Sequence, residues 1–129
     1  MSGERYLLDT NAIVYLLRGG YTLQEQLQSA AWVGISILSY IEFLAFPNLS
    51  ENDRRIFQKF SEAIDIVSLD KTELALIDRV ITLRSQQRLK LPDAIIAATA
   101  IERDATLITD DQQLRRLSAV KSAGTALTG

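Results

Sequence analysis

Short apolar runs alternate along the chain with longer segments in which apolar residues recur at helical spacing. The short runs are rich in Leu, Ile and Val, as buried strands are. They lie at 5–9, 33–38, 64–69 and 105–108. The helical segments lie at 12–17, 22–31, 39–46, 50–62, 71–89, 93–103 and 111–117. Strands that alternate with helices, without a hairpin signal, predict an α/β fold: a three-layer α/β/α sandwich around a mostly parallel sheet of about four to five strands.

The longest predicted helix, 71–89, carries two neighbouring apolar stripes. Both follow the i, i+3, i+4, i+7 spacing of an amphipathic helix. The stripes consist of Leu74, Ile77 and Ile81, and of Leu76, Val80 and Leu83. Together they predict one broad buried face.

The composition is that of an ordinary globular domain over residues 1–129. Apolar residues make up 47% of the chain and charged residues 23%, and the length of 129 residues suits one core and not two. No apolar run approaches the roughly 20 residues that cross a bilayer. Because residues 1–5 also lack a signal-peptide pattern, we expect a cytoplasmic protein with no membrane partner. Residues 122–129 are expected to form a frayed tail.

Two missing residue types narrow the chemistry further. With no His and no Cys, the chain supplies neither a Ser-His-Asp triad, nor a thiolate nucleophile, nor a Cys/His zinc site. It also lacks the G-x-x-x-x-G-K-[ST] loop of P-loop enzymes. Carboxylates, hydroxyls, amides, Lys and Arg remain for any catalytic role.

Three carboxylates lie in apolar surroundings. Asp9 follows the first strand, and Glu42 and Asp93 lie on helices that are apolar nearly all round. An unpaired buried carboxylate costs several kcal/mol in effective terms, and no Lys or Arg lies within five residues of Glu42. A shared divalent cation would neutralise all three. The pair Asp110 and Asp111 also follows a strand, and thus falls at the carboxyl edge where open α/β folds bind ligands.

Helix capping offers a purely structural alternative for each acid. Ser39-x-x-Glu42 matches a capping box, in which Glu42 bonds the backbone of Ser39. Asp9 is placed to cap the first helix, and Asp93 lies in the first turn after Pro92. The last helix has three candidate caps, Thr109, Asp110 and Asp111.

Four motifs in order resemble the PIN-domain family, particularly the VapC-type toxins of bacterial toxin–antitoxin pairs. The motifs are Leu7-Leu8-Asp9-Thr10-Asn11, Ser39-x-x-Glu42-Phe43, Leu91-Pro92-Asp93 with its run to Ala100, and Leu107-Ile108-Thr109-Asp110-Asp111. The family's fourth motif usually reads T-x-D-x-x-F, and this chain has Leu114 at the aromatic position. Asp111 matches the acid by register, with Asp110 in reserve.

The resemblance implies a Mg²⁺- or Mn²⁺-dependent ribonuclease. Asp9 and Asp93 would bind the metal directly, and Glu42 and Asp111 would bind a second ion or hold its waters. The supporting residues would be Asn11 and Thr109, which orient the acids by hydrogen bonds. Metal-activated water would attack the phosphodiester and leave a 5′-phosphate and a 3′-hydroxyl. The resemblance also implies a homodimer and a cognate antitoxin that inserts a segment into the acidic site.

Two groups of residues can be interpreted in two ways. A net charge of −2 requires any RNA contact to be local. Four basic residues without an intervening acid could supply that contact or could form a solvated helix face. These bases are Arg79, Arg84, Arg88 and Lys90. The aromatic residues Tyr40, Phe43 and Phe46 could stack on bases or belong to the core or a subunit interface.

Two other functions are alternatives to the ribonuclease. A phosphoacceptor receiver module also has acids at the carboxyl edge of an α/β/α sandwich. It would require paired acids after the first strand and a Lys near the last one, and neither is present here. A catalytically silent PIN-like scaffold that binds RNA or protein is the second alternative, and metal-dependent cleavage distinguishes it from the enzyme.

Overall fold

The computed structural model describes residues 3–127 and contains a five-stranded sheet in the order β3-β2-β1-β4-β5. Every pair of neighbouring strands is parallel. The strands are β1 (Arg5–Leu8), β2 (Trp32–Ser36), β3 (Asp65–Val67), β4 (Thr106–Ile108) and β5 (Ser122–Ala123). The predicted parallel sheet is therefore confirmed.

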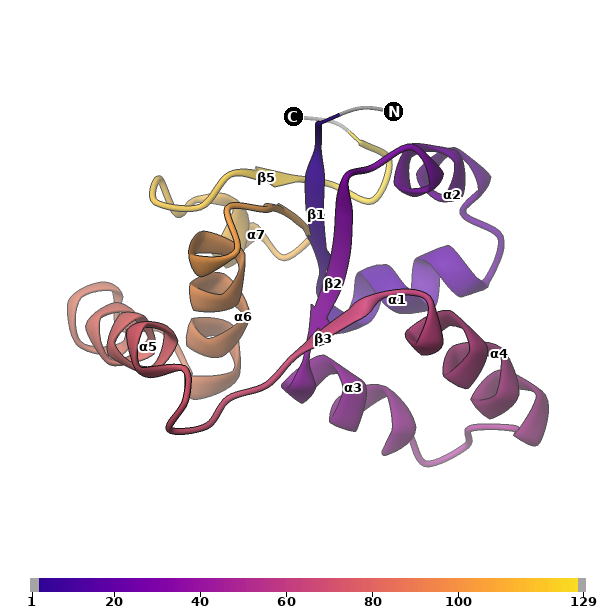
Figure 1. Ribbon diagram of the computed structural model, residues 1–129, viewed down its shortest axis with the longest axis horizontal. Coiled ribbons are helices and arrows are strands. Elements are labelled where there is room, and N and C mark those ends of the chain that lie inside the picture. Colours follow the sequence, from indigo (N-terminus) through magenta and orange to yellow (C-terminus); the bar gives the residue numbers. More distant parts are fainter. Residues whose placement is uncertain (1–2, 128–129) are drawn as a thin grey trace.

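Helices cover both faces of this sheet (Figure 1). One face carries α5 (Leu74–Gln87) and α6 (Leu91–Glu102), and the other carries α1 to α4. These four are α1 (Thr10–Leu17), α2 (Tyr21–Gln28), α3 (Ile37–Leu44) and α4 (Glu51–Glu62); the short α7 (Gln112–Arg115) follows β4. The result is the predicted three-layer α/β/α sandwich. In residues 3–127, no helix is both long and apolar enough to span a bilayer.

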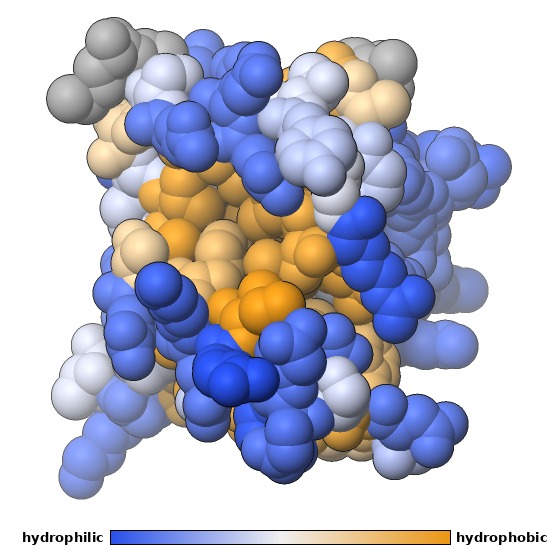
Figure 2. Space-filling view, turned by 90° about the vertical axis from the view of Figure 1, so that its right-hand side faces the viewer, coloured by the Kyte–Doolittle hydropathy of each residue, from blue (hydrophilic) through white to orange (hydrophobic). Residues whose placement is uncertain are grey.

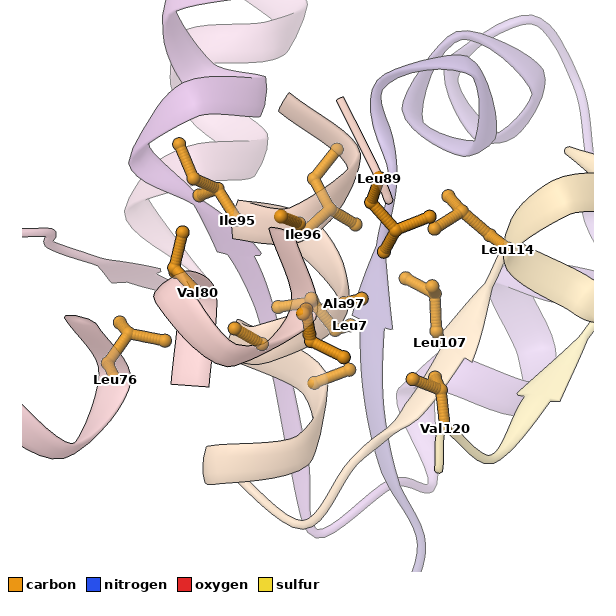
Figure 3. Close-up of a cluster of buried hydrophobic side chains, with 14 of the residues drawn as sticks. Leu7, Leu76, Val80, Leu89, Ile95, Ile96, Ala97, Leu107, Leu114 and Val120 are labelled. Carbon is orange, nitrogen blue, oxygen red and sulfur yellow. The ribbon is translucent and has the colours of Figure 1, made fainter. Parts of the chain in front are cut away.

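The two cores result from the alternation of side chains along the strands. Leu7 and Leu107 point to the α5/α6 face, whereas Leu8 and Ile108 point to the opposite face, as the two-residue period of a strand requires. Figure 3 shows the first of these clusters, in which Leu7 and Leu107 of the sheet meet side chains of α5, α6 and α7. The alanines of α6, such as Ala97, allow this helix to lie close against the sheet.

The predicted capping box on α3 is wrong. The helix begins two residues earlier than expected, because the Ser36 hydroxyl accepts a hydrogen bond from the Leu38 backbone and caps it. Ser39 consequently lies inside the helix, fully buried, and its hydroxyl has no hydrogen-bond partner among the described residues. Glu42 does not bond the Ser39 backbone; it projects toward the carboxyl edge of the sheet.

These two serines should respond to the same substitution with opposite signs. Ser39→Ala removes a buried hydroxyl whose hydrogen bond with water is lost on folding, so we expect it to raise the free energy of unfolding by about 1 kcal/mol. Ser36→Ala removes a helix cap and should lower it by about 1 kcal/mol. Urea denaturation of both variants measures the difference, and a loss of stability in Ser39→Ala would contradict the expectation.

Only one of the two stripes on α5 is buried. Leu76, Val80 and Leu83 pack into the core, whereas Leu74 and Ile81 are 64% and 59% exposed. Both stripes have helical spacing, but the helix can present only one of them to α6 and the sheet. The predicted broad buried face is therefore wrong for the stripe that contains Leu74 and Ile81.

The C-terminal segment also differs from the prediction. Residues 122–127 do not fray: β5 adds to the edge of the sheet beside β4, and Thr125 is buried. The Thr109 backbone N–H donates to the Ala123 carbonyl at 2.9 Å. Residues 128–129 of the expected tail lie outside the described residues.

Candidate active site

The strand order reverses its direction beside β1. From β1 the chain builds outward through β2 to β3 and then returns to the other side of β1 with β4 and β5. In open α/β sheets, such a switch point leaves a crevice at the carboxyl ends of the strands, where ligands bind. Asp9 directly follows β1, and Thr109, Asp110 and Asp111 follow β4. Two of the sequence motifs therefore meet at this crevice.

A cleft of about 230 Å³ opens at this position. Its lining comes from α1, α3, α6 and α7 and from residues that flank them, and it contains the four acids predicted from the sequence. The lining residues are Asp9, Thr10, Asn11, Glu42, Phe46, Pro92, Asp93, Ile96, Asp111 and Leu114. Carboxylates that are up to 102 positions apart in the sequence (Asp9 and Asp111) thus share one cavity.

Asp9 is the most buried of these acids, at 7% exposed. Its Oδ1 accepts the Ala12 backbone N–H at 2.8 Å and so caps α1, while its Oδ2 accepts the Thr109 hydroxyl at 2.5 Å. Burial raises the pKa of Asp9 more than these hydrogen bonds lower it, and the charges of Asp110 and Asp111 raise it further. The cap predicted for Asp9 is present, and the same carboxylate lines the cleft.

Thr10, and not Asn11, orients Glu42. The Thr10 hydroxyl donates to Glu42 Oε1 at 2.7 Å and so joins the first two motifs. Asn11 lines the cleft but donates no hydrogen bond to the four acids within residues 3–127. Sequence analysis missed Thr10 although it directly follows Asp9, because a Thr at the start of a helix is also common for structural reasons.

Asp93 lies in the first turn of α6, where the helix dipole favours a negative charge. Burial and the nearby charge of Asp111 raise the pKa of this carboxyl, the charge of Lys90 lowers it, and Glu42 raises it. Asp93 accepts no hydrogen bond from the described residues. Its carboxylate is therefore available for a ligand.

The structure separates the two neighbouring aspartates. Asp111 lines the cleft, and its Oδ1 caps α7 by accepting the backbone N–H of Gln113 at 2.8 Å. Asp110 instead accepts two hydrogen bonds from Thr125, from the backbone at 2.9 Å and from the hydroxyl at 2.6 Å. These bonds lower the pKa of Asp110. The Thr109–Asp111 turn is thus fixed to the C-terminal segment.

Loss of the Thr125 hydroxyl should loosen this attachment. Thr125→Val keeps the shape of the side chain but removes a hydrogen bond to a charged acceptor, so we expect the free energy of unfolding to fall by about 1–2 kcal/mol. Thr125→Ser retains the hydroxyl and serves as the control. Urea unfolding at neutral pH compares the two, and equal losses in both variants would mean that the methyl group, and not the bond to Asp110, stabilises the segment.

The four carboxylates suit a divalent cation by chemistry, since Mg²⁺ and Mn²⁺ prefer oxygen ligands. Within residues 3–127, no three Asp or Glu side chains are placed closely enough to surround an ion. The hydrogen bonds from Ala12, Thr10 and Gln113 hold the side chains as caps and links. Each carboxylate oxygen has two lone pairs, so these bonds leave donor sites free. The chemistry of the donor set therefore fits a divalent cation.

The four candidate RNA-binding bases differ in their surroundings. Arg79 forms an ion pair with Glu102 at 3.0 Å, and Arg84 donates to the Leu89 carbonyl at 3.3 Å. Both therefore have structural partners. Lys90 is the one whose charge lowers the pKa of Asp93, which places it beside the cleft.

Comparison with known proteins gives a family for this architecture. The family model of the PIN domain matches residues 6–120. The chain belongs to the PIN domain family. This membership excludes the receiver module that the sequence analysis considered. No curated protein shows significant sequence similarity to this PIN domain.

Solved structures that resemble this PIN domain include chains of toxin–antitoxin complexes. VapBC2 of Rickettsia felis, bound to a promoter DNA fragment, matches with a TM-score of 0.75 and 19% identity over 93% of this chain and 98% of that chain. A toxin–antitoxin complex from Klebsiella pneumoniae matches with a TM-score of 0.71 and 27% identity, over 89% of this chain and 94% of that chain. DNA-bound VapBC from Salmonella typhimurium matches with a TM-score of 0.74 and 15% identity, over 95% of this chain and 98% of that chain.

Proposed function

We propose that this PIN domain is a metal-dependent ribonuclease that acts as the toxin of a toxin–antitoxin pair. The observation that carries the proposal is the cleft at the strand switch point, which is lined by Asp9, Glu42, Asp93 and Asp111. The similarity to chains of toxin–antitoxin complexes supports the toxin role. Burial, with a smaller contribution from neighbouring carboxylates, raises the pKa values of Asp9 and Asp93, and a bound cation would favour their ionised forms.

Each side chain has a defined task in this proposal. Asp9 and Asp93 hold the ion, and Glu42 and Asp111 hold a second ion or its waters. A bound Mg²⁺ or Mn²⁺ supplies an electrophile that lowers the pKa of a water and offsets charge on the phosphate. Thr109 keeps the Asp9 carboxylate oriented through its hydroxyl. With no His in the chain, a carboxylate is the group available to accept the proton of the attacking water.

A positively charged residue lies beside the cleft, where it suits a polyanion. The four acids repel RNA unless a cation is bound, and the net charge of −2 gives no general attraction. Lys90 supplies a positive charge next to Asp93. We propose that it contacts a phosphate that flanks the scissile one.

An apolar groove supports a protein partner. Figure 2 shows apolar residues in a hollow on the face of α1, α2 and α4, bordered by polar side chains. The groove is lined by Leu16, Leu17, Leu27, Val33, Phe60 and Ile64, among others. Its apolar lining and polar border suit a helix with one apolar face. We propose that a helix of the antitoxin covers this groove, and that a further segment of the antitoxin reaches the acidic cleft.

Self-association is the other partner proposed for this chain. The resemblance to VapC-type toxins implies a homodimer. Leu74 and Ile81 on α5 are apolar and exposed. A second copy of the chain would cover them if it packed against this helix. We propose this face for the contact between the two copies.

Cleavage of defined RNA with identified ends tests the enzymatic proposal. The purified protein is incubated with short single-stranded RNAs and Mn²⁺, and the products are mapped by sequencing and by treatment with a 5′-phosphate-dependent exonuclease. We expect cleavage that requires the metal and leaves a 5′-phosphate and a 3′-hydroxyl. Products with a 2′,3′-cyclic phosphate would contradict water as the nucleophile.

The matched control distinguishes the chain from a contaminating nuclease and from a silent scaffold. Asp93→Asn keeps the shape of the side chain in the cleft but removes its charge, so it should abolish cleavage. If the wild type leaves every RNA intact, or if Asp93→Asn cleaves equally, the ribonuclease proposal is wrong.

A further inference from the structure

The aromatic residues of α3 and α4 divide into a packed group and one exposed ring. Phe57 stacks on Phe43 with ring centroids 4.2 Å apart, and Tyr40 and Phe60 pack against Phe57. Phe43 and Phe57 are buried, so these four rings belong to the core. Phe46 differs from them, since it is 38% exposed.

Phe46 is the one aromatic residue in the lining of the acidic cleft within residues 3–127. It follows the end of α3, where its backbone N–H bonds Phe43 and its carbonyl accepts the N–H of Leu49. One part of its ring packs on Phe43 at a centroid distance of 5.5 Å. The backbone turn and this contact hold the ring at the edge of the cleft.

A second cavity lies on the other side of Phe46. Its lining is mostly apolar, with one cation and one acid at its edge: Val14, Leu17, Arg18, Phe43, Phe46, Leu49, Asp53 and Ile56. Phe46 thus separates a cavity with four carboxylates from one that is apolar. A flat, uncharged group joined to a phosphate in the cleft would reach this position.

We propose that Phe46 is the stacking platform for the nucleobase next to the scissile phosphate. This inference rests on the proposed ribonuclease function and names the substrate contact that the acids do not provide. Aromatic rings bind bases of single-stranded RNA by stacking, and Arg can add contact with the adjoining phosphate. Arg18, on the apolar side of Phe46, carries the charge for that phosphate. The Asp53 carboxylate supplies an acceptor for a base amino group.

The inference predicts a coupling between one ring and one base. An RNA whose cleavage site has been mapped with the wild type is made as a series, in which each member lacks one base. In the wild type, removal of the base beside the scissile phosphate should lower kcat/KM by about 5- to 150-fold. In Phe46→Leu, the same removal should change kcat/KM less than about 2-fold, since the partner ring is already absent.

Matched variants separate stacking from general damage to the fold. Phe46→Trp retains an aromatic ring and should retain the sensitivity to base removal. Tyr21→Leu removes a ring that is 73% exposed and outside the cleft, so it should behave as the wild type. Thermal unfolding of each variant verifies that the compared proteins are folded.

The outcomes distinguish this inference from the ribonuclease proposal. If the wild type cleaves RNA with Mn²⁺ but Phe46→Leu stays equally sensitive to base removal at every position, Phe46 is not a stacking platform although the enzyme is. If Phe46→Leu instead weakens only the complex with an antitoxin, the ring contacts a protein partner and the inference is wrong. If the wild type cleaves no RNA, the ribonuclease proposal itself fails.

Discussion

Asp9→Asn should abolish cleavage and at the same time stabilise the protein without metal. Loss of this carboxylate removes a proposed metal ligand, and we expect activity to fall by at least about 10³-fold. Burial raises the pKa of Asp9, so its ionised form is unfavourable in the folded state. Asn can still accept the Ala12 N–H as the helix cap. The neutral side chain should therefore raise the melting temperature at pH 7.

The sign of this effect depends on pH. An acid whose pKa is raised on folding binds its proton more tightly in the folded state, so the cost of ionising it appears as pH rises above the ordinary value of 3.8. The stability gain of Asp9→Asn should therefore be larger at pH 7 than near pH 4, because Asp9 is more protonated in the folded protein at the lower pH. Thermal unfolding at both values measures it.

Asp104→Asn is the matched control for this substitution. The Asp104 side chain is 83% exposed and lies outside the cleft, and its positive φ suits Asn. We expect it to retain cleavage and to leave the melting temperature nearly unchanged. If Asp9→Asn proves less stable than the wild type at pH 7, the carboxylate contributes more through its bonds with Thr109 and Ala12 than it costs through burial.

Mn²⁺ should stabilise the wild type strongly and Asp9→Asn weakly. A ligand at 100 times its Kd adds about 2.7 kcal/mol to the free energy of unfolding. Binding requires ionised carboxylates, and the pKa values of Asp9 and Asp93 are both raised. As the pH is lowered, protonation of these carboxyls should weaken the stabilisation by Mn²⁺. This loss should begin at a higher pH than it would for carboxyls with ordinary pKa values. Urea unfolding with Mn²⁺ or with EDTA measures it across pH 4–8.

A nonspecific effect of the ion would appear in the same experiment. Asp104→Asn should respond to Mn²⁺ as the wild type does, because its substitution removes an exposed charge and an exposed ion pair with Lys121, both outside the cleft. An equal increment in Asp9→Asn and in the wild type would show that Mn²⁺ binds elsewhere, and the cleft would lose its role as the metal site.

Local patterns predicted the layers and the sheet well, because apolar runs and caps are encoded by adjacent residues. The expected strand at 33–38 and the expected helix at 50–62 both correspond to observed elements, with their ends shifted by one or two residues. The strand Ser122–Ala123 was missed because two residues with small side chains carry no hydrophobic period. Its existence depends on the open edge of β4.

Contacts between distant residues decided what local patterns left open. The choice between Asp110 and Asp111 depends on Thr125, which binds Asp110 and leaves Asp111 at the cleft. The two stripes of α5 were equivalent in spacing, and the packing of α6 selected the one with Val80. The role of Thr10 required the position of Glu42, 32 residues away.

The bond between Thr109 and Asp9 joins residues that are 100 positions apart, and it has a consequence for synthesis. A ribosome makes Asp9 long before the Thr109–Asp111 turn, and Thr125, which fixes that turn, follows later still. A nascent chain that lacks these last residues holds three of the acids without their fourth member. We therefore expect the proposed enzyme to gain activity toward RNA only after the Thr109–Asp111 turn has been synthesised.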